Sequence, residues 1–206
     1  MQVKPEEIYF TSGGTEADNW AIRGIAKALK EKGKHIITSA IEHAAVLQTC
    51  KYLETQGYEV TYLKVDSQGK IDLKELEDTI RRDTILISIM YANNEVGTVQ
   101  PVKQISDIAH AHGILFHTDA EKHLPGILNI SFCGREAEQI LGYLDRKEIY
   151  ASGGSACSSH DRKPSHVLQA MGKTEEKIKG AIRFSLGYDN TEEEMAQVIE
   201  ALNKMK

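Results

Sequence analysis

The sequence contains few cysteines, no excess of basic residues and no long apolar run, and each absence excludes a class of protein. Its three cysteines, Cys50, Cys133 and Cys157, are widely spaced. They form neither a disulfide framework nor a zinc-binding pattern, so we expect no metal site and a reducing, cytoplasmic location. The net charge of -5 and the pI near 5.9 argue against nucleic acid as a partner. No apolar run approaches the roughly 20 residues of a membrane-spanning helix, and no signal peptide is visible at the first residues.

The composition is that of an ordinary globular protein. Hydrophobic residues make up 41% of the 206 residues and charged residues 27%. This length suffices for one domain or two small ones. There is no low-complexity segment, no internal repeat and no linker rich in Pro, Gly and Ser.

Expected strands and helices alternate through residues 1–120. The short β-type run 8–10 leads into a helix that includes Ala21 to Leu29, and the later expected strands are 35–39, 59–65, 84–90 and 114–117. Helices are expected between them, at about 44–56, 72–82 and 101–112. Strands that alternate with helices predict βαβ units and a mostly parallel sheet.

The pattern changes after Ala120, which predicts a second, smaller unit. Two expected strands, 127–132 and 181–186, are accompanied by expected helices near 135–146, 164–171 and 191–205. We therefore expect an α/β domain at 1–120 and a small α+β domain at 121–206.

Several polar residues stand where expected strands end, and each has two interpretations. Gly13-Gly14-Thr15 comes after an expected strand and opens a helix, so Gly14 and Thr15 suit either a phosphate site or a plain helix-opening turn. Asp119 ends an apolar strand, where it either pairs with a cation or caps a helix. His43 is either a site residue or filler, and Asn94 either faces a ligand at the carboxyl end of the sheet or simply makes a turn.

Two residues of the second half also have alternative roles. Cys157 lies in a Gly/Ser-rich stretch, where a thiolate could act as a nucleophile, although most cysteines are buried and inert. Arg183 lies in an expected strand, where it either binds a carboxylate with its fork of donors or pairs with a surface acid.

Together, five ordered motifs resemble those of the cysteine desulfurases, which depend on pyridoxal phosphate (PLP) and belong to the class-V aminotransferases. The motifs are Thr11-Ser12-Gly13-Gly14-Thr15-Glu16-Ala17, Ile41-Glu42-His43, Tyr91-Ala92-Asn93-Asn94-Glu95-Val96-Gly97-Thr98, His117-Thr118-Asp119-Ala120 and Ser152-Gly153-Gly154-Ser155-Ala156-Cys157-Ser158-Ser159. The resemblance implies fold type I of the PLP-dependent transferases, with a partial large domain and a small carboxyl-terminal domain.

The resemblance also implies a role for each candidate residue. Gly14 and Thr15 would hold the PLP phosphate, and Asp119 would pair with the pyridinium nitrogen so that the ring stays an electron sink. His43 would stack on the ring and relay protons, and Asn94 would lie near its phenolic oxygen. Arg183 would bind the carboxylate of L-cysteine. Cys157 would take the substrate sulfur as a persulfide, leaving L-alanine, for iron–sulfur cluster assembly or another sulfur-transfer pathway.

The family pattern breaks after Ala120. There, members of this family have a long stretch with a Ser-x-His-Lys motif, whose lysine binds PLP covalently, whereas this sequence continues into Glu121 and Lys122. The amino-terminal family segment is also missing before Met1. Without that lysine, no base is placed to take the α-proton of the substrate. We expect the loss of the last large-domain strands to expose apolar strand edges.

These observations leave three hypotheses for the chain. It is a cysteine desulfurase-like protein without standard turnover, a weak enzyme that uses Lys122 as a substitute, or a sulfur carrier or scaffold that accepts persulfide on Cys157 without PLP. The resemblance implies L-cysteine and a sulfur-acceptor or iron–sulfur scaffold protein as partners. It also suggests a homodimer or pairing with an intact paralogue.

Overall fold

The computed structural model describes residues 4–118, 126–154 and 164–205. The chain divides into two compact units, and neither is continuous in sequence. Unit 1 comprises Met1–Leu63, Ile71–Tyr91 and Pro101–Ala120, and unit 2 comprises Lys64–Lys70, Ala92–Gln100 and Glu121–Lys206. Two loops from the first half of the chain thus belong to the second unit. The assignment of domains to 1–120 and 121–206 stays a prediction.

Unit 1 is built on a parallel sheet. Its strands are β1 (His35–Ser39), β2 (Glu59–Leu63), β3 (Thr84–Ser88) and β4 (Leu115–His117), in the order β2-β1-β3-β4. Every residue of β1 and β3 is buried, because these central strands are covered on both faces. Since all four strands run the same way, their carboxyl ends meet at one edge of the sheet.

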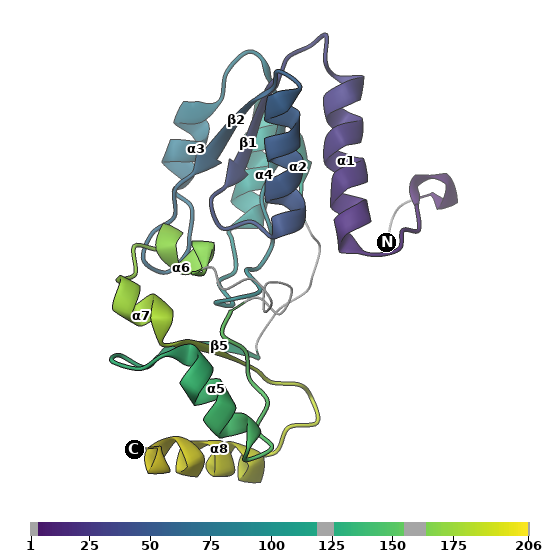
Figure 1. Cartoon of the computed structure of the whole chain (residues 1–206). Coiled ribbons are helices and arrows are strands. Elements are labelled where there is room, and N and C mark those ends of the chain that lie inside the picture. The colour runs from purple at the N-terminus through teal and green to yellow at the C-terminus, as the bar shows by residue number, and fades with distance from the viewer. Residues whose placement is uncertain (1–3, 119–125, 155–163, 206) are drawn as a thin grey trace. The chain divides into compact units, whose positions relative to one another are not determined.

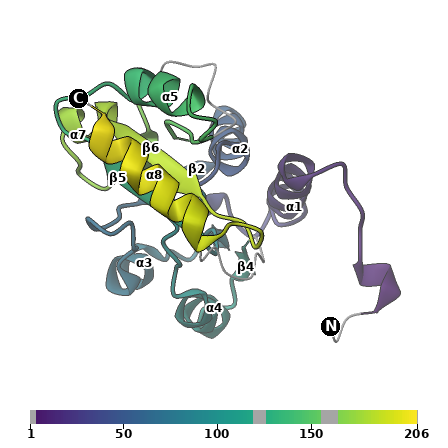
Figure 2. The same ribbon diagram turned by 90° about the horizontal axis from the view of Figure 1, so that it is seen from below.

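Helices cover both faces of this sheet. The helices α1 (Gly14–Ala28) and α2 (Ala44–Thr55) lie side by side on one face, as both views show (Figures 1 and 2). On the opposite face lie α3 (Leu73–Thr79) and α4 (Val102–Ala111) (Figure 2). A short 3₁₀ helix, η1 (Pro5–Glu7), comes before α1 in the chain. This arrangement is the three-layer α/β architecture that the alternating pattern predicts.

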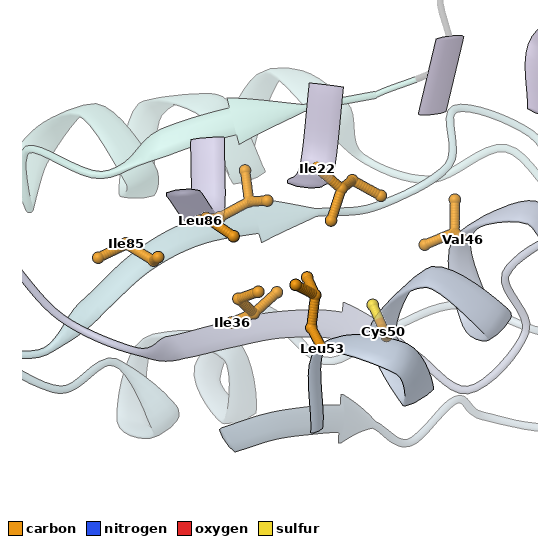
Figure 3. Close-up of a cluster of buried hydrophobic side chains, with 8 residues drawn as sticks. Ile22, Ile36, Val46, Cys50, Leu53, Ile85 and Leu86 are labelled. Atoms are coloured by element: carbon orange, nitrogen blue, oxygen red, sulfur yellow. The ribbon is translucent and has the colours of Figure 1, made fainter. Parts of the chain in front are cut away.

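The core of unit 1 lies between the α1–α2 layer and the sheet. Figure 3 shows Ile22 of α1 and Cys50 and Leu53 of α2 facing Ile36 and Leu86 of the strands. All five are at most 4% exposed. The apolar residues of α1 recur at helical spacing, which places Ile22 and Ala26 one turn apart on its buried side. This packing fixes both helices over the sheet and so positions their first turns.

Unit 2 contains a two-stranded antiparallel sheet of β5 (Ile127–Ser131) and β6 (Ala181–Ser185). Its helices are α5 (Ala137–Asp145), α6 (His166–Ala170), α7 (Glu175–Lys179) and α8 (Glu192–Lys204). Ile140 and Leu144 of α5 pack with Ile182 of β6 and Ala201 of α8. In Figure 2, α8 lies over this pair of strands.

One expectation about the elements is wrong, and one observed helix was not expected. Residues 8–10 form no strand, and Ile8, Tyr9 and Phe10 are 45%, 69% and 95% exposed. Their β-type side chains do not suffice, because a strand needs a neighbouring strand to pair with. The helix α7 was not expected, since five residues are too few for a periodic pattern. Leu115 lies on β4 at the edge of the sheet and is 49% exposed, which agrees with the expected exposure of apolar strand edges. Among the described residues, no helix is long and apolar enough to cross a bilayer.

Candidate functional site

The carboxyl edge of the parallel sheet in unit 1 carries a small pocket. It is lined by polar residues and by the ends of two strands: Asp18, Glu42, His43, Val46, Ser88, Ile89, Met90, His117 and Thr118. These residues come from α1, from the first turn of α2 and the loop before it, and from the last residues of β3 and β4 and the segments that follow them. Ligands of α/β proteins bind at such an edge, because the loops and helix N-termini converge there.

The Gly-rich turn before α1 is open to a ligand. Gly13 is the N-cap of α1 and makes no side-chain capping hydrogen bond. A Cβ added at Gly13 or Gly14 would meet no atom within 4 Å. The first N–H groups of a helix lack partners within the helix, and its dipole favours an anion there. The Glu16 side chain turns back towards Ser12, because its Oε2 accepts from the backbone N–H and the hydroxyl of Ser12 at 2.7 and 2.9 Å. Gly14 and Thr15 are thus exposed at a helix start whose first turn has room for a phosphate.

His43 is the N-cap of α2 and lies half-buried in the pocket. Its Nδ1 accepts a hydrogen bond from the backbone N–H of Ala45 at 3.2 Å. When Nδ1 accepts, the neutral imidazole carries its proton on Nε2. The neighbouring Glu42 is 1% exposed, and its Oε1 accepts from the Ser39 hydroxyl at 2.5 Å and the Met90 N–H at 3.0 Å. Glu42 therefore ties the end of β1 to the segment after β3 and holds His43 beside it.

A chain of polar contacts links α1 to the ends of two strands. Asp18 Oδ1 lies 3.7 Å from Nε2 of His117, and Nδ1 of His117 lies 2.9 Å from the Ser88 hydroxyl oxygen. The loss of solvent around Asp18 raises its pKa, and this effect is opposed by the charges of His117 and His43. Sequence reasoning missed Asp18 and Ser88. One available signal was the spacing of Asp18, three residues after Thr15 and so on the same side of α1.

Thr118 adds a polar atom without a partner. Its Oγ1 is buried and has no hydrogen-bond partner in the part of the chain that the structure describes. Buried hydroxyls are rarely left unpaired, because an unmade hydrogen bond costs about 1–3 kcal/mol. This atom marks a position in the pocket where a polar group of a ligand fits. Asp119, the next residue, lies outside the described residues, as do Lys122 and Cys157.

The other two predicted site residues, Asn94 and Arg183, are brought together in unit 2. Nη1 of Arg183 donates to the backbone carbonyl of Asn94 at 3.0 Å. Arg183 lies on β6 opposite Asn129 and also forms an isolated β-bridge with Ser152. Among the described residues, Nε of Arg183 is buried without a hydrogen-bond partner. The guanidinium is therefore fixed on one side and keeps a donor for an anion such as a carboxylate.

A second buried carboxylate supports this part of unit 2. Glu95 is 4% exposed, and its Oε2 accepts from the Ser165 hydroxyl at 2.5 Å. Its backbone N–H donates to Oδ1 of Asn93 at 2.8 Å, while its carbonyl accepts from Nδ2 of Asn129 at 3.3 Å. These bonds hold the loop 92–100 against β5 and α6. They fix the backbone from which Asn94 projects.

Comparison with known proteins identifies clear relatives. The aminotransferase class-V family matches residues 1–126 and again residues 120–198. The cysteine desulfurase IscS of Methanosarcina thermophila is 38% identical over 312 residues, which cover 98% of this chain and 77% of the relative. IscS of Clostridium botulinum strain Hall is 31% identical over 318 residues, which cover 100% of this chain and 80% of the relative. A solved structure titled NifS-like protein has a TM-score of 0.89 at 26% identity, covering 98% of this chain and 83% of that one.

Proposed function

The chain belongs to the cysteine desulfurases of aminotransferase class V, and from this premise we propose that it binds PLP without completing the family's catalytic cycle. The observation that carries the proposal is in the sequence, which contains no Ser-x-His-Lys motif. In the family this motif supplies both the covalent attachment of PLP and the base that takes the α-proton of L-cysteine. A chain without it keeps a binding site but lacks that base.

The alignments support an internal gap at this point. The M. thermophila relative aligns over 312 positions, whereas the whole chain has 206 residues, so at least 106 positions of the relative have no counterpart here. The two family matches meet at residues 120–126, where the sequence passes from Asp119-Ala120 into Glu121-Lys122. These are the residues at which the family resemblance places the missing segment.

The described residues of unit 1 fit PLP. Gly14 and Thr15 would receive the phosphate at the open first turn of α1, and His43 would lie against the ring. The unpaired hydroxyl of Thr118 would satisfy a polar atom of the cofactor. We propose that Asp119 pairs with the pyridinium nitrogen and that Asn94 lies near the phenolic oxygen. When bound, PLP supplies an electron sink for bonds at the α-carbon of an amino acid.

In unit 2, Arg183 would hold the carboxylate of L-cysteine. Its Nη1 is already engaged by the Asn94 carbonyl, which orients the guanidinium, while Nε is free of protein partners among the described residues. Because the chain is proposed not to cleave L-cysteine, Cys157 would instead accept sulfur from a persulfide carried by a partner. Its thiolate would attack the outer sulfur, and a new sulfur–sulfur bond would form as the sulfur–sulfur bond of the partner breaks and the thiolate of the partner leaves. A sulfur-acceptor protein, an iron–sulfur scaffold or an intact paralogue would be the partner, in the cytoplasm.

A PLP titration with two further measurements tests the proposal. We expect saturable binding of PLP that weakens in T15A, no single lysine labelled after borohydride reduction and peptide mapping, and no sulfide release from L-cysteine above free PLP. Sulfide release that is lost in C157A would refute the claim of no turnover. A label confined to Lys122 would identify a substitute lysine. A persulfide on Cys157 with no PLP binding would identify a sulfur carrier instead.

A further inference from the structure

A surface groove runs between α1 and α2 and shares no lining residue with the pocket at the carboxyl edge. One wall is formed by Trp20, Arg23 and Lys27 of α1, and the other by Tyr52 of α2 and Tyr58, which precedes β2. Figure 1 shows the two helices side by side on the same face of unit 1. All the lining residues belong to unit 1, so the groove does not depend on unit 2.

Aromatic rings are exposed along this groove. Trp20 is 54% exposed and Tyr52 is 45% exposed. The edge of Trp20 contacts Tyr9, with ring centroids 5.2 Å apart, and the hydroxyl of Tyr58 donates to the Ala26 carbonyl at 2.7 Å. Between these rings Gly24 leaves room, because an added Cβ there would meet only Cδ1 of Trp20, at 4.0 Å. Exposed aromatic side chains next to such a gap are typical of binding surfaces.

Basic side chains follow the same side of α1. Arg23 and Lys27 are four residues apart on α1 and so lie on the same side of it, and Lys30 follows just past the end of the helix. All three line the groove and form a basic row. The guanidinium of Arg23 stacks on the ring of Tyr52 at 4.6 Å from its centroid, which leaves its edge donors for an anion. Lys30 pairs with Glu31 at 3.6 Å, whereas no ion pair of Lys27 occurs among the described residues. This row is basic on a chain whose net charge is -5.

We propose that this groove is a docking site for an acidic segment of a partner protein, with carboxylates on Arg23 and Lys27 and an apolar side chain between Trp20 and Tyr52. Exposed ion pairs alone contribute little to affinity, so the apolar contact over Gly24 has to supply most of it. The charges then select acidic partners and speed their association. This proposal is independent of PLP binding and of turnover.

Charge also favours an acidic protein segment over nucleic acid. A nucleic acid site needs a run of basic contacts that tracks the phosphate backbone. Here, Glu16 also lines the groove, and Glu31 stands beside Lys30 at its far end. A short segment with carboxylates at two points and an apolar residue between them matches the charge pattern better.

The single tryptophan of the chain reports on this groove directly. The probe is the Trp-free peptide acetyl-Asp-Glu-Phe-Asp-Glu-Leu-Glu-Asp-amide, titrated into the full chain while Trp20 emission is recorded. We expect a blue shift, because the peptide would remove water from the ring, and an affinity that falls as salt rises. A peptide with lysine in place of every acidic residue serves as the control and is expected not to bind.

Variants separate charge from shape. K27E is expected to weaken binding about tenfold, whereas K103E, which makes the same charge change on α4 at the opposite face, is expected to leave it unchanged. G24L fills the gap without a change of charge, so it is expected to abolish binding. Because Gly is unfavourable in a helix interior, G24L is not expected to lower Tm.

Three results would overturn the proposal. The first is that K27E and K103E bind the acidic peptide with equal affinity, or that G24L binds it as tightly as the wild type does. The second is binding of an oligothymidylate as tight as that of the acidic peptide, which would identify a nucleic acid site. The third is a dimer in sedimentation velocity that dissociates in K27E, because the groove would then be filled by a second copy of the chain.

Discussion

Acidification is expected to destabilise unit 1 through one buried histidine, His35. It is the first residue of β1 and is 1% exposed. Its Nδ1 lies 2.7 Å from the hydroxyl oxygen of Thr84, and its Nε2 lies 2.8 Å from that of Thr61. A threonine hydroxyl both donates and accepts, so the neutral ring satisfies both nitrogens. The protonated ring would instead place a positive charge inside the sheet.

The pKa of His35 is lowered from its ordinary value of 6.5, first by burial and then by the positive charge of Arg81, while Asp83 and Glu59 oppose the shift. Between pH 6.5 and the folded-state pKa, the unfolded chain therefore binds a proton that the folded chain does not. The full contribution of neutral His35 to stability is present above pH 6.5. It is lost as the pH falls from 6.5 through the folded-state pKa.

The magnitude follows from linkage. One proton taken up only by the unfolded chain lowers the free energy of unfolding by up to about 1.4 kcal/mol for each pH unit. Domains of this kind have a total stability of about 5–15 kcal/mol, so a drop over one pH unit is measurable. The fall should stop once the pH is below the folded-state pKa, because both states are then protonated.

The assay is urea unfolding from pH 8 to pH 4.5, followed by Trp20 fluorescence and circular dichroism. H35Q keeps an amide donor and acceptor but does not titrate, so it should be less stable at neutral pH by about 1–3 kcal/mol and show a smaller loss below pH 6.5. H110Q, which replaces an exposed histidine on α4, should keep the wild-type slope. Equal slopes for H35Q and the wild type would refute the assignment of this loss to His35.

Three further results are expected. Iodoacetamide should label the exposed Cys133 in the native chain but not the buried Cys50. Burial, and then the nearby Glu42 and Glu54, raise the pKa of the Cys50 thiol to about 12. Mass spectrometry of the native and the unfolded chain checks this. G33A should lose several kcal/mol in urea unfolding because its Cβ would lie 2.1 Å from the Asp83 carbonyl oxygen, whereas G24A, with only one atom at 4.0 Å, should gain about 1 kcal/mol. The pKa of Asp18 is raised in the folded chain, so its stabilising contribution is lost as the pH rises. The free energy of unfolding of D18N, compared with that of the wild type, should therefore be higher at pH 7 than at pH 3.5. A difference that does not change with pH would contradict this.

The order of elements in unit 1 was predictable because each is set by local chemistry. The strand 35–39 and the helix expected at 44–56 are observed as β1 and as α2 at Ala44–Thr55. Two other elements are shorter than expected: the strand expected at 84–90 ends at Ser88, and the helix expected to reach Arg82 ends at Thr79. A hydrophobic run continues past the last ladder hydrogen bond, so composition alone overestimates the length of a strand.

The candidate site was predictable only in part. His43, Gly14 and Thr15 follow or open elements that the pattern detects, and the family resemblance assigns their roles. Asp18 and Ser88 belong to no recognisable motif of their own. They became visible only when the sheet brought α1, β3 and β4 together around His117. Likewise, no spacing in the sequence indicates that Arg183 donates to the Asn94 carbonyl, 89 residues away.

By itself, the sequence determined the family, the βαβ alternation and the fact that it contains no Ser-x-His-Lys motif, because these depend on residue identity and local order. Tertiary structure decided which strands pair and which side chains meet. Residues 8–10 illustrate the limit: their β-type side chains indicate a strand, but they form none and remain exposed. Thr118 and Arg183 show the converse, since burial leaves a polar atom of each without a protein partner among the described residues. Pairing and burial depend on what surrounds a residue, and only the folded chain supplies those surroundings.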